Sequence, residues 1–362
     1  MRASGGYSER QRTQPTAGRR CALAYRDRAH PRLSLQRLNA MTLIHSEITS
    51  RWALQVSDRL LTVASSSGAQ PFDSRSNKTV VLHARDAIVT LSYTGLAYLQ
   101  DTPTDAWIAH KLNGTQFPFN PKAVDFTMRL GMRRSEWPAL GCALSQLAAA
   151  LTQAASLPRS DLRRSSITVA VAGWLWYRRK RPRAVLATVG KVGSDEFGVK
   201  WAPRRHGKYF LHLIAPNGYL SDFERQEVHA RLAGADLEDA TAIFASSIRR
   251  VAARTDTVGA DCMSVSISHP WMDERTINAR FLPNLGEVAE KPRTSPRFAA
   301  YSPWVVGPHQ CLAPMLLVGA GGQFNVGQYR LVLSGPQPEY RPPHPIGALF
   351  APQPRKRFRS SG

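Results

Sequence analysis

Acidic residues and cysteines are scarce in this chain, and long apolar runs are missing. It has 26 Asp and Glu against 48 Lys and Arg, which gives a formal net charge of +22 over 362 residues. The four cysteines, Cys21, Cys142, Cys262 and Cys311, are far apart and form no CxxC pair. This spacing argues against a zinc site or a disulfide scaffold and fits a reducing compartment. The longest apolar run, residues 167–177, is shorter than the ~20 residues that a membrane-spanning helix needs.

Signals for export, metal binding and cofactor binding are also absent. Residues 1–40 lack the apolar stretch of a secretory signal, so we expect a cytoplasmic protein without a membrane partner. The ten histidines form no HExxH motif, and there is no Gly-rich Walker loop. The glycine-rich run at residues 318–322 has Phe324 in place of its third glycine and continues as a strand rather than a helix. We therefore expect no cofactor and no metal.

The excess positive charge lies mainly at the two ends of the chain. Residues 1–40 carry nine Arg against one Glu and one Asp, and residues 355–359 read RKRFR. This distribution favours solvated tails, although a basic nucleic-acid-binding module stays open as a different function class. Trp174 and Trp176 beside the basic loop 178–183 suit base stacking, yet they are more typical of a buried strand that ends in an exposed loop.

Composition divides the chain into four segments. Residues 1–41 are a basic leader that we expect to be disordered: a propeptide, a disordered arm, or upstream sequence included by a wrong choice of start codon. The last explanation is favoured, because Met41 opens a clearly patterned segment. Residues 42–269 form the main domain, residues 270–336 a β-rich extension without an assigned function, and residues 337–362 a disordered basic tail.

Apolar periodicity within the main domain alternates between strand and helix patterns. Strands are expected at residues 42–48, 52–57, 79–83, 87–93, 167–176, 184–189, 209–214 and 262–267. Residues 65–71 read as a loop. Helices are expected at residues 104–112 with Thr104 as N-cap, at 135–155, and at 237–254 with Asp236 as N-cap. This order predicts an α+β fold, a four-layer αββα sandwich of two antiparallel sheets between helix layers, with a β-rich C-terminal appendage.

Met41-Thr42 is the sharpest chemical feature. A small residue after an initiator Met permits removal of that Met, which would leave Thr42 with a free amine beside its own hydroxyl. An α-amine with a pKa of about 7.7–8.0 can take the hydroxyl proton, directly or through a water, and so activate the oxygen as a nucleophile. Alone this signal is weak, because Thr after Met is common.

The residues that follow Thr42 strengthen it. Asp58 lies sixteen positions on, followed by Arg59 and, four after the acid, by Thr62; Lys78 then precedes a strand, and Gly95 ends the next one. This order resembles that of proteasome β-subunits and of the peptidase subunit of the related bacterial ATP-dependent protease, within the N-terminal-nucleophile hydrolase superfamily. The resemblance implies the same four-layer fold and covers the main domain only.

The resemblance also implies roles for these residues. Thr42 is the nucleophile, Asp58 holds Lys78 by ion pairing, and Lys78 lowers the pKa of the Thr hydroxyl. The backbone of Thr62 pairs with an extended substrate, and the amide of Gly95 stabilises the oxyanion.

Asp256, before the last strand of the main domain, corresponds to a further acidic residue of the family. The family has a Ser three positions after that acid, and this chain has Gly259. The supporting network near the amine is weakened accordingly.

The expected function is a threonine hydrolase, a peptidase that forms an acyl-enzyme on Thr42 after removal of residues 1–41. Its partners would be a peptide or protein substrate and further copies of itself in a ring or other homo-oligomer. The alternative within the same fold is a non-proteolytic acylase, or a catalytically silent subunit whose amine is blocked by residues 1–41.

Overall fold

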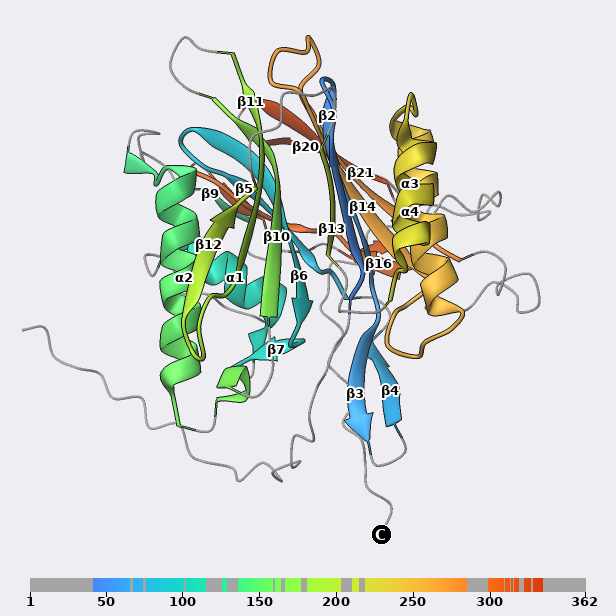
Figure 1. The fold of residues 1–362 in the computed structure, drawn as a ribbon. Helices are drawn as coiled ribbons and strands as arrows, with labels where there is room; N and C mark the ends of the chain where they lie inside the picture. Colours follow the sequence, from blue (N-terminus) through green and yellow to red (C-terminus); the bar gives the residue numbers. More distant parts are fainter. Residues whose placement is uncertain are drawn as a thin grey trace, which may run out of the picture. The chain divides into compact units, whose positions relative to one another are not determined.

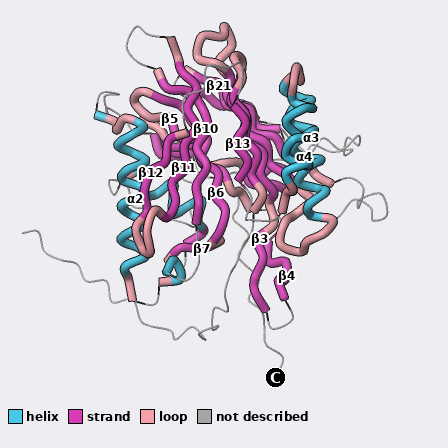
Figure 2. Tube along the Cα trace, in the orientation of Figure 1, coloured by secondary structure: helices cyan, strands magenta, loops and turns pink. Residues whose placement is uncertain are grey.

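The computed structural model describes residues 42–334, except for 66–67, 74–75, 101, 115–125, 129–135, 159, 164–166, 177–180, 203–209, 215–218, 285–298, 309, 313, 315, 319–321 and 327. The predicted leader and tail, and part of the basic loop 178–183, therefore lie outside the described residues. The fold is mixed α+β, with two large sheets and four α-helices among the described residues (Figures 1 and 2).

The seven-stranded sheet carries Thr42 and Asp58 at one end of its central strands. Its order is β13-β1-β2-β14-β15-β21-β20. The strands are β1 (Ile44–Ile48), β2 (Trp52–Asp58), β13 (Phe210–Ile214), β14 (Cys262–Ser268), β15 (Thr276–Leu282), β20 (Gly322–Val326) and β21 (Tyr329–Ser334).

The eight-stranded sheet carries Lys78 and Gly95. Its order is β12-β11-β10-β6-β5-β17-β18-β9. The strands are β5 (Thr79–His83), β6 (Ala87–Gly95), β9 (Phe126–Met128), β10 (Ile167–Leu175), β11 (Arg183–Lys191), β12 (Phe197–Trp201), β17 (Trp304–Val306) and β18 (Gln310–Leu312).

Three two-stranded sheets and the helices complete the fold. The pairs are β3 (Leu61–Ser65) with β4 (Gly68–Asp73), β7 (Tyr98–Leu99) with β8 (Thr102–Pro103), and β16 (Ala299–Tyr301) with β19 (Leu316–Val318). The helices are α1 (Thr104–Asn113), α2 (Leu140–Ser156), α3 (Asp222–Leu232) and α4 (Leu237–Ala252), with a 3-10 turn at Asp161–Arg163.

The apolar stripes of the helices face the sheets, as their periodicity predicts. Helices α1 and α2 contact strands of the eight-stranded sheet, and α4 contacts β2 and β14 of the seven-stranded sheet. The two large sheets also share a cluster of buried apolar side chains. It includes Ala53, Ile88, Ala172 and Val265. Figure 1 shows α2 and α4 on opposite sides of the paired strands.

Several boundaries agree with the prediction, and others do not. Residues 79–83 form β5 as expected, and Asp236 caps α4 by accepting a hydrogen bond from Asp239 N at 2.9 Å. Thr104 is the first residue of α1 rather than its N-cap, which is Pro103, and the Thr104 hydroxyl donates to the Leu96 carbonyl instead of capping the helix. The loop predicted at residues 65–71 is wrong, since part of it pairs as β4.

The prediction of two purely antiparallel sheets is also wrong. Strand β21 pairs with β15 in parallel, and β17 pairs with β5 in parallel. Parallel neighbours need a long crossover instead of a hairpin, and here residues beyond 270 supply a strand of each parallel pair. The segment expected as an extension thus contributes strands to both large sheets, while its boundary at residue 269 stays a prediction.

Gly173 marks a close approach between β10 and β6. A Cβ built on Gly173 would lie 2.2 Å from the Ile88 carbonyl oxygen and 2.7 Å from Val89 Cα. The same atom on Gly190, in β11, would meet only ordinary contacts, the nearest being Thr168 Oγ1 at 3.5 Å. Only the first position therefore requires glycine for space.

We expect Gly173→Ala to lower the free energy of unfolding by about 1–3 kcal/mol, because the methyl group must push paired backbone apart. Urea denaturation of both variants is the measurement, with Gly190→Ala as the matched control that stays close to the parent. Equal stability of the two variants would contradict the tight strand packing.

A buried histidine links β1 to α4. The ring of His45 stacks on Phe244, with centroids 4.8 Å apart and 7° between the planes. Among the described residues neither ring nitrogen has a hydrogen-bond partner. Burial, helped by the positive charge of Arg250, lowers the pKa of His45 to about 3.

We expect this histidine to make the fold sensitive to acid. The pKa in the folded state lies below the ordinary value of 6.5, so the stabilising contribution is complete above pH 6.5 and is lost as pH falls towards 3. By pH 4.5 the free energy of unfolding should be about 3 kcal/mol lower than at neutral pH. Urea denaturation between pH 4.5 and 7 measures it, and His45→Leu should give a flatter profile. Identical profiles would show that His45 is not the titrating group.

Candidate active site around Thr42

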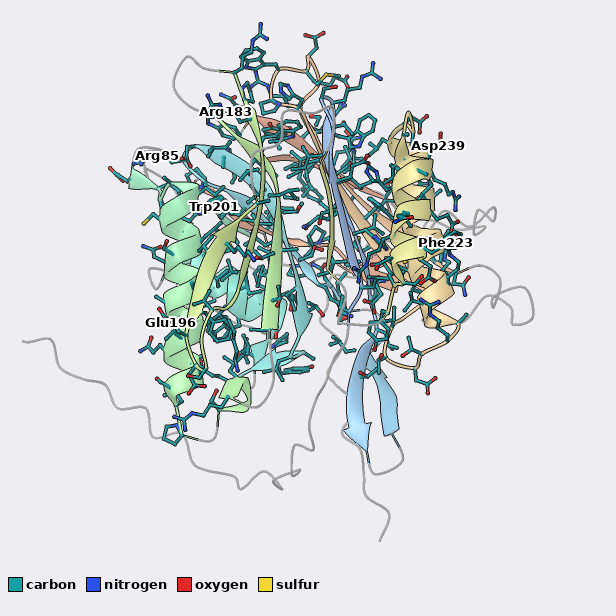
Figure 3. All side chains as sticks on the ribbon, in the orientation of Figure 1. Arg85, Arg183, Glu196, Trp201, Phe223 and Asp239 are labelled. Atoms are coloured by element: carbon teal, nitrogen blue, oxygen red, sulfur yellow. The ribbon has the colours of Figure 1, made fainter. Side chains whose placement is uncertain are left out.

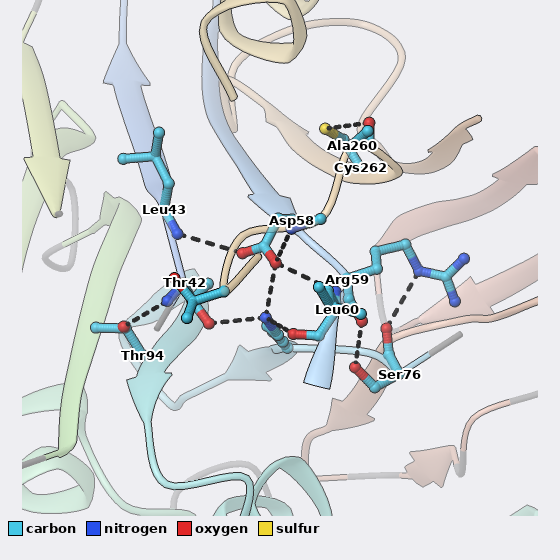
Figure 4. Close-up of polar contacts among 12 residues, drawn as sticks. Thr42, Leu43, Asp58, Arg59, Leu60, Ser76, Thr94, Ala260 and Cys262 are labelled. Atoms are coloured by element: carbon cyan, nitrogen blue, oxygen red, sulfur yellow. Dashed lines mark hydrogen bonds and ion pairs between the residues drawn. The ribbon is translucent and has the colours of Figure 1, made fainter. Parts of the chain in front are cut away.

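Thr42 lies two residues before β1, and its hydroxyl accepts a hydrogen bond from a buried lysine. The lysine, Lys78, donates from Nζ to Thr42 Oγ1 at 2.7 Å (Figure 4). Thr42 is only 1% exposed. The contact joins the beginning of the seven-stranded sheet to the segment that leads into β5 of the other sheet.

Every proton of the Lys78 ammonium has an acceptor. Besides Thr42 Oγ1, Nζ donates to Asp58 Oδ2 at 3.0 Å and to the Leu60 carbonyl at 2.6 Å. An ammonium carries three donors and no acceptor. The lysine is therefore satisfied as a cation although its side chain is 0% exposed.

The Asp58 carboxylate is held equally firmly. Oδ1 accepts from Leu43 N at 3.2 Å, and Oδ2 accepts from Leu60 N at 3.1 Å and from Gly259 N at 3.0 Å as well as from Lys78. A carboxylate with this many donors is stabilised in its charged form. The side chain of Asp58 thereby ties together β1, β2 and the segment before β14.

Burial and ion pairing act on these two groups in opposite directions. Removal from water lowers the pKa of Lys78, and the charge of Asp58 works against that fall. Burial likewise raises the pKa of Asp58, opposed by Lys78 and by the N–H groups of Gly259 and Leu60. Removing either partner would leave the other as an unpaired buried charge.

The end of β6 approaches Thr42 from the other side. Thr42 N donates to Thr94 Oγ1 at 3.2 Å, and Tyr93 N donates to the Lys78 carbonyl at 3.0 Å. Gly95 follows at once with φ of 112°, a conformation that favours glycine. The residue expected to supply the oxyanion amide thus directly follows a residue in contact with Thr42.

Gly259 approaches the backbone of Leu60 closely. A Cβ on Gly259 would lie 2.6 Å from Leu60 Cβ and 3.1 Å from Leu60 N. The glycine in this position therefore contributes through its own N–H, which reaches Asp58, and leaves no room for the serine of the family pattern.

Residues beyond 270 support the segment before Lys78. Asn77 Nδ2 donates to the Ser302 carbonyl at 3.0 Å. Arg59 Nε donates to the Ser76 carbonyl at 3.1 Å, and the Arg59 guanidinium lies 4.5 Å from the centre of the Phe281 ring. These contacts fix the chain immediately before Lys78.

The sequence-predicted residues are brought together in part. Thr42, Asp58 and Lys78 form one hydrogen-bonded cluster, and Gly95 lies next to Thr94. Thr62 is buried on β3, opposite Pro71 of β4. Asp256 is not brought to the cluster: it is exposed in a turn, and within the described residues no hydrogen bond or ion pair joins it to the other residues. The roles of all these residues stay predictions.

Sequence reasoning assigned no role in this cluster to three participants: Thr94, Leu60 and Gly259. Leu60 and Gly259 take part through backbone atoms, and a backbone contact cannot be identified from residue type alone. Thr94 could have been considered because it precedes Gly95. However, its partner Thr42 lies 52 positions away in the chain, so the contact could not be predicted from local pattern.

Two further properties concern ligands and membranes. Within the described residues, no group of three or more His, Cys, Asp or Glu side chains is arranged to hold a metal ion. None of the described helices combines the length and the hydropathy needed to cross a bilayer.

Comparison of the sequence with known proteins identifies no relative. No family model matches the chain, and no curated protein matches it. Among solved structures, it is similar to Anbu (ancestral beta-subunit) from Yersinia bercovieri, with 10% identity, coverage of 62% of this chain and 82% of that chain, and a TM-score of 0.39. Anbu from Hyphomicrobium sp. strain MC1 gives 11% identity, coverage of 64% and 86%, and a TM-score of 0.36.

These findings overturn the family assignment made from residue spacing. Membership of the proteasome β-subunit-like superfamily is not supported, since no family model matches and the similar structures share about a tenth of their residues with this chain at TM-scores below 0.5. The spacing from Thr42 to Gly95 involves only a handful of residues, too few to establish descent. What the chain does must be argued from its own site.

The approach of Gly259 to Leu60 gives a direct test of how tightly the site is packed. We expect Gly259→Ala to lower the free energy of unfolding by about 1–3 kcal/mol. The added methyl group would displace Leu60, whose backbone contacts both Lys78 and Asp58. Gly141→Ala is the control: its Cβ meets nothing within 4 Å in α2, so it should stabilise by roughly 0.5–1 kcal/mol. The free energy of unfolding is measured by thermal or urea denaturation. Equal values for the two variants would contradict the close packing at Gly259.

Proposed function

We propose that the chain is a hydrolase of amide bonds, a threonine-type peptidase, whose nucleophile is the hydroxyl of Thr42. The observation that carries the proposal is the 2.7 Å contact from Lys78 Nζ to Thr42 Oγ1, inside a fully buried ion pair. A cation at this distance favours the alkoxide over the alcohol and lowers the pKa of the hydroxyl.

The second requirement is a base, and Thr42 itself supplies one once residues 1–41 are removed. Lys78 is poorly suited to that task, because its three protons are held by three acceptors. A free α-amine at Thr42 has a pKa of about 7.7–8.0 when unperturbed, close to neutrality. It therefore accepts the proton of Oγ as the hydroxyl attacks.

The reaction then follows in two balanced steps. Thr42 Oγ bonds to the carbonyl carbon while its proton passes to the α-amine, and the amide of Gly95 donates to the oxyanion. The ammonium returns its proton to the leaving amine as the carbon–nitrogen bond breaks, which leaves an ester on Thr42. Water, deprotonated by the same amine, hydrolyses the ester and restores the hydroxyl.

An extended peptide suits the surroundings of the site. Strand β3 pairs with β4 in a two-stranded sheet, which Figure 1 shows extending beyond the ends of the large sheets. In the described part of the chain β3 has no second strand partner. Its other edge includes Thr62 and would pair with substrate backbone. Thr62 is only 1% exposed, so this edge must first be uncovered.

We infer the expected four-layer order from the packing of the described elements. Helices α1 and α2 contact the eight-stranded sheet, α4 contacts the seven-stranded sheet, and the two sheets share a buried cluster. Thr42 and Lys78 precede β1 and β5, a strand of each sheet, and their 2.7 Å contact supports this order.

Self-assembly is a separate part of the proposal. Phe223 is 75% exposed on α3, and Trp201 is 46% exposed on the edge strand β12 (Figure 3). Single exposed apolar side chains also occur on monomers, so these two positions are sites where contact with another copy can be tested. Light scattering of the purified full-length protein gives its mass in solution, and a monomer at all concentrations would contradict assembly.

The test of the catalytic proposal combines two measurements on the natively expressed protein. Intact mass should show a mature chain that begins at Thr42, and an electrophile selective for N-terminal Thr should label it. We expect Thr42→Ala to abolish labelling and peptide cleavage. Lys78→Met should slow both about 10²–10³-fold, because it removes the charge that stabilises the alkoxide, while Lys200→Met, a surface control, should leave them unchanged.

Each alternative gives a different result. A mature chain that retains residues 1–41 and takes no label is a catalytically silent subunit, and the proposal fails. Labelling that survives Thr42→Ala places the nucleophile elsewhere. Labelling with cleavage of small amides but not of peptides identifies a non-proteolytic acylase.

A further inference from the structure

The backbone nitrogen of Thr42 has a side-chain partner that sequence reasoning did not identify. Thr42 N lies 3.2 Å from Thr94 Oγ1, and Thr94 is 8% exposed. The residues beside Thr94 are fixed: Tyr93 N is bonded to the Lys78 carbonyl, and Thr94 pairs with Thr168 of β10. The backbone that carries the Thr94 hydroxyl is therefore held by a strand on each side.

Other candidates to receive the α-amine are occupied, distant or absent. Asp58 already accepts from three backbone N–H groups and from Lys78. Asp256 is exposed in its turn and, among the described residues, makes no hydrogen bond to this cluster. Gly259 has no side chain, and Leu60 fills the space that one would need.

We propose that Thr94 is the positioning residue for the α-amine of Thr42. This inference rests on the proposed function, since it concerns the chain in which Thr42 is N-terminal. The hydroxyl of Thr94 accepts one N–H of the amine and so restricts the directions in which the lone pair of the nitrogen can point.

The contact gains strength as the reaction proceeds. When the proton of Thr42 Oγ moves to the α-amine, the nitrogen becomes an ammonium, and its hydrogen bond to Thr94 Oγ1 becomes charge-assisted. An interaction that is stronger in the transition state than before it accelerates the chemical step. No atom or proton leaves Thr94, which acts on the amine alone.

Thr94 also couples two tasks through one short segment. The hydroxyl of Thr94 holds the amine, and the amide of Gly95, the next residue, is the proposed donor to the oxyanion. The φ of 112° at Gly95 turns the chain immediately after this amide. The base and the oxyanion donor are thereby fixed relative to each other by a single peptide unit.

The test uses Thr94→Val, which keeps the shape of the side chain and removes its oxygen. Without its acceptor the ammonium is less stable, so the pKa of the amine falls. The acidic limb of the pH profile of kcat/KM should move about one unit lower. The plateau value of kcat should fall about ten- to hundredfold, because the ammonium formed in the transition state has lost a partner.

Two variants separate positioning from a merely structural effect. Thr94→Ser keeps the oxygen and should restore the profile and most of the rate. Thr90→Val removes another buried hydroxyl of β6, which donates to the Ala172 carbonyl at 3.1 Å. It should affect stability but leave the acidic limb in place.

A second readout does not depend on turnover. The rate at which cyanate modifies the Thr42 amine, followed against pH by peptide mass, reports the pKa of that amine directly. A lower pKa in Thr94→Val than in the parent supports the proposal, and the same pKa and rate in both overturns it. If mature parent protein carries no free Thr42 amine, both proposals fail; if Thr42 is free and labelled but Thr94→Val changes nothing, only the role of Thr94 fails.

Discussion

The rest of the site depends on the buried ion pair between Lys78 and Asp58. Both side chains are fully removed from water, which is costly for two charges unless every donor and acceptor is used. Here the three protons of Lys78 and both oxygens of Asp58 have partners. The one partner of Lys78 that is neither a carboxylate nor a backbone carbonyl is the hydroxyl of Thr42. The requirement to satisfy a buried cation thus places a positive charge against a potential nucleophile.

This pair also spans the two sheets. Asp58 ends β2 of the seven-stranded sheet, and Lys78 precedes β5 of the eight-stranded sheet. Their separation of 3.0 Å holds only if the sheets keep their register across the shared core, where Gln55 Nε2 reaches the Ala170 carbonyl and Gln55 Oε1 accepts from Ser92. The packing of the two sheets therefore determines both the stability of the fold and the geometry of the site. A change in the core far from Thr42 can alter the site by shifting one sheet against the other.

The sequence predicted those parts of the structure that depend on local pattern. Strands β5, β6 and β10 are rich in apolar and β-branched residues, and α4 has both an apolar stripe and the Asp236 cap, so all were found close to their observed bounds. Helix α3 was missed because only Val228 and Leu232 of its side chains are buried, although Ser221 and Glu224 form a capping box that signals its start. Thr42, Asp58 and Lys78 were found through spacing. Thr94 and Gly259 were not assigned a role, since a contact across 52 residues and a backbone N–H are properties of the fold rather than of residue type.

Sequence analysis assigned no function to the segment after residue 270. In the structure, its strands support the residues around the ion pair. Strand β17 lies parallel to β5 with Trp304 opposite Val80, two residues beyond Lys78. Just before that strand, the Ser302 carbonyl accepts from Asn77, the residue before Lys78, and Phe281 of β15 packs on Arg59 beside Asp58. The late segment of the chain therefore holds the backbone on both sides of the ion pair. Because a buried charge tolerates little displacement from its acceptors, the strands of this late segment help to decide whether Lys78 can reach Thr42.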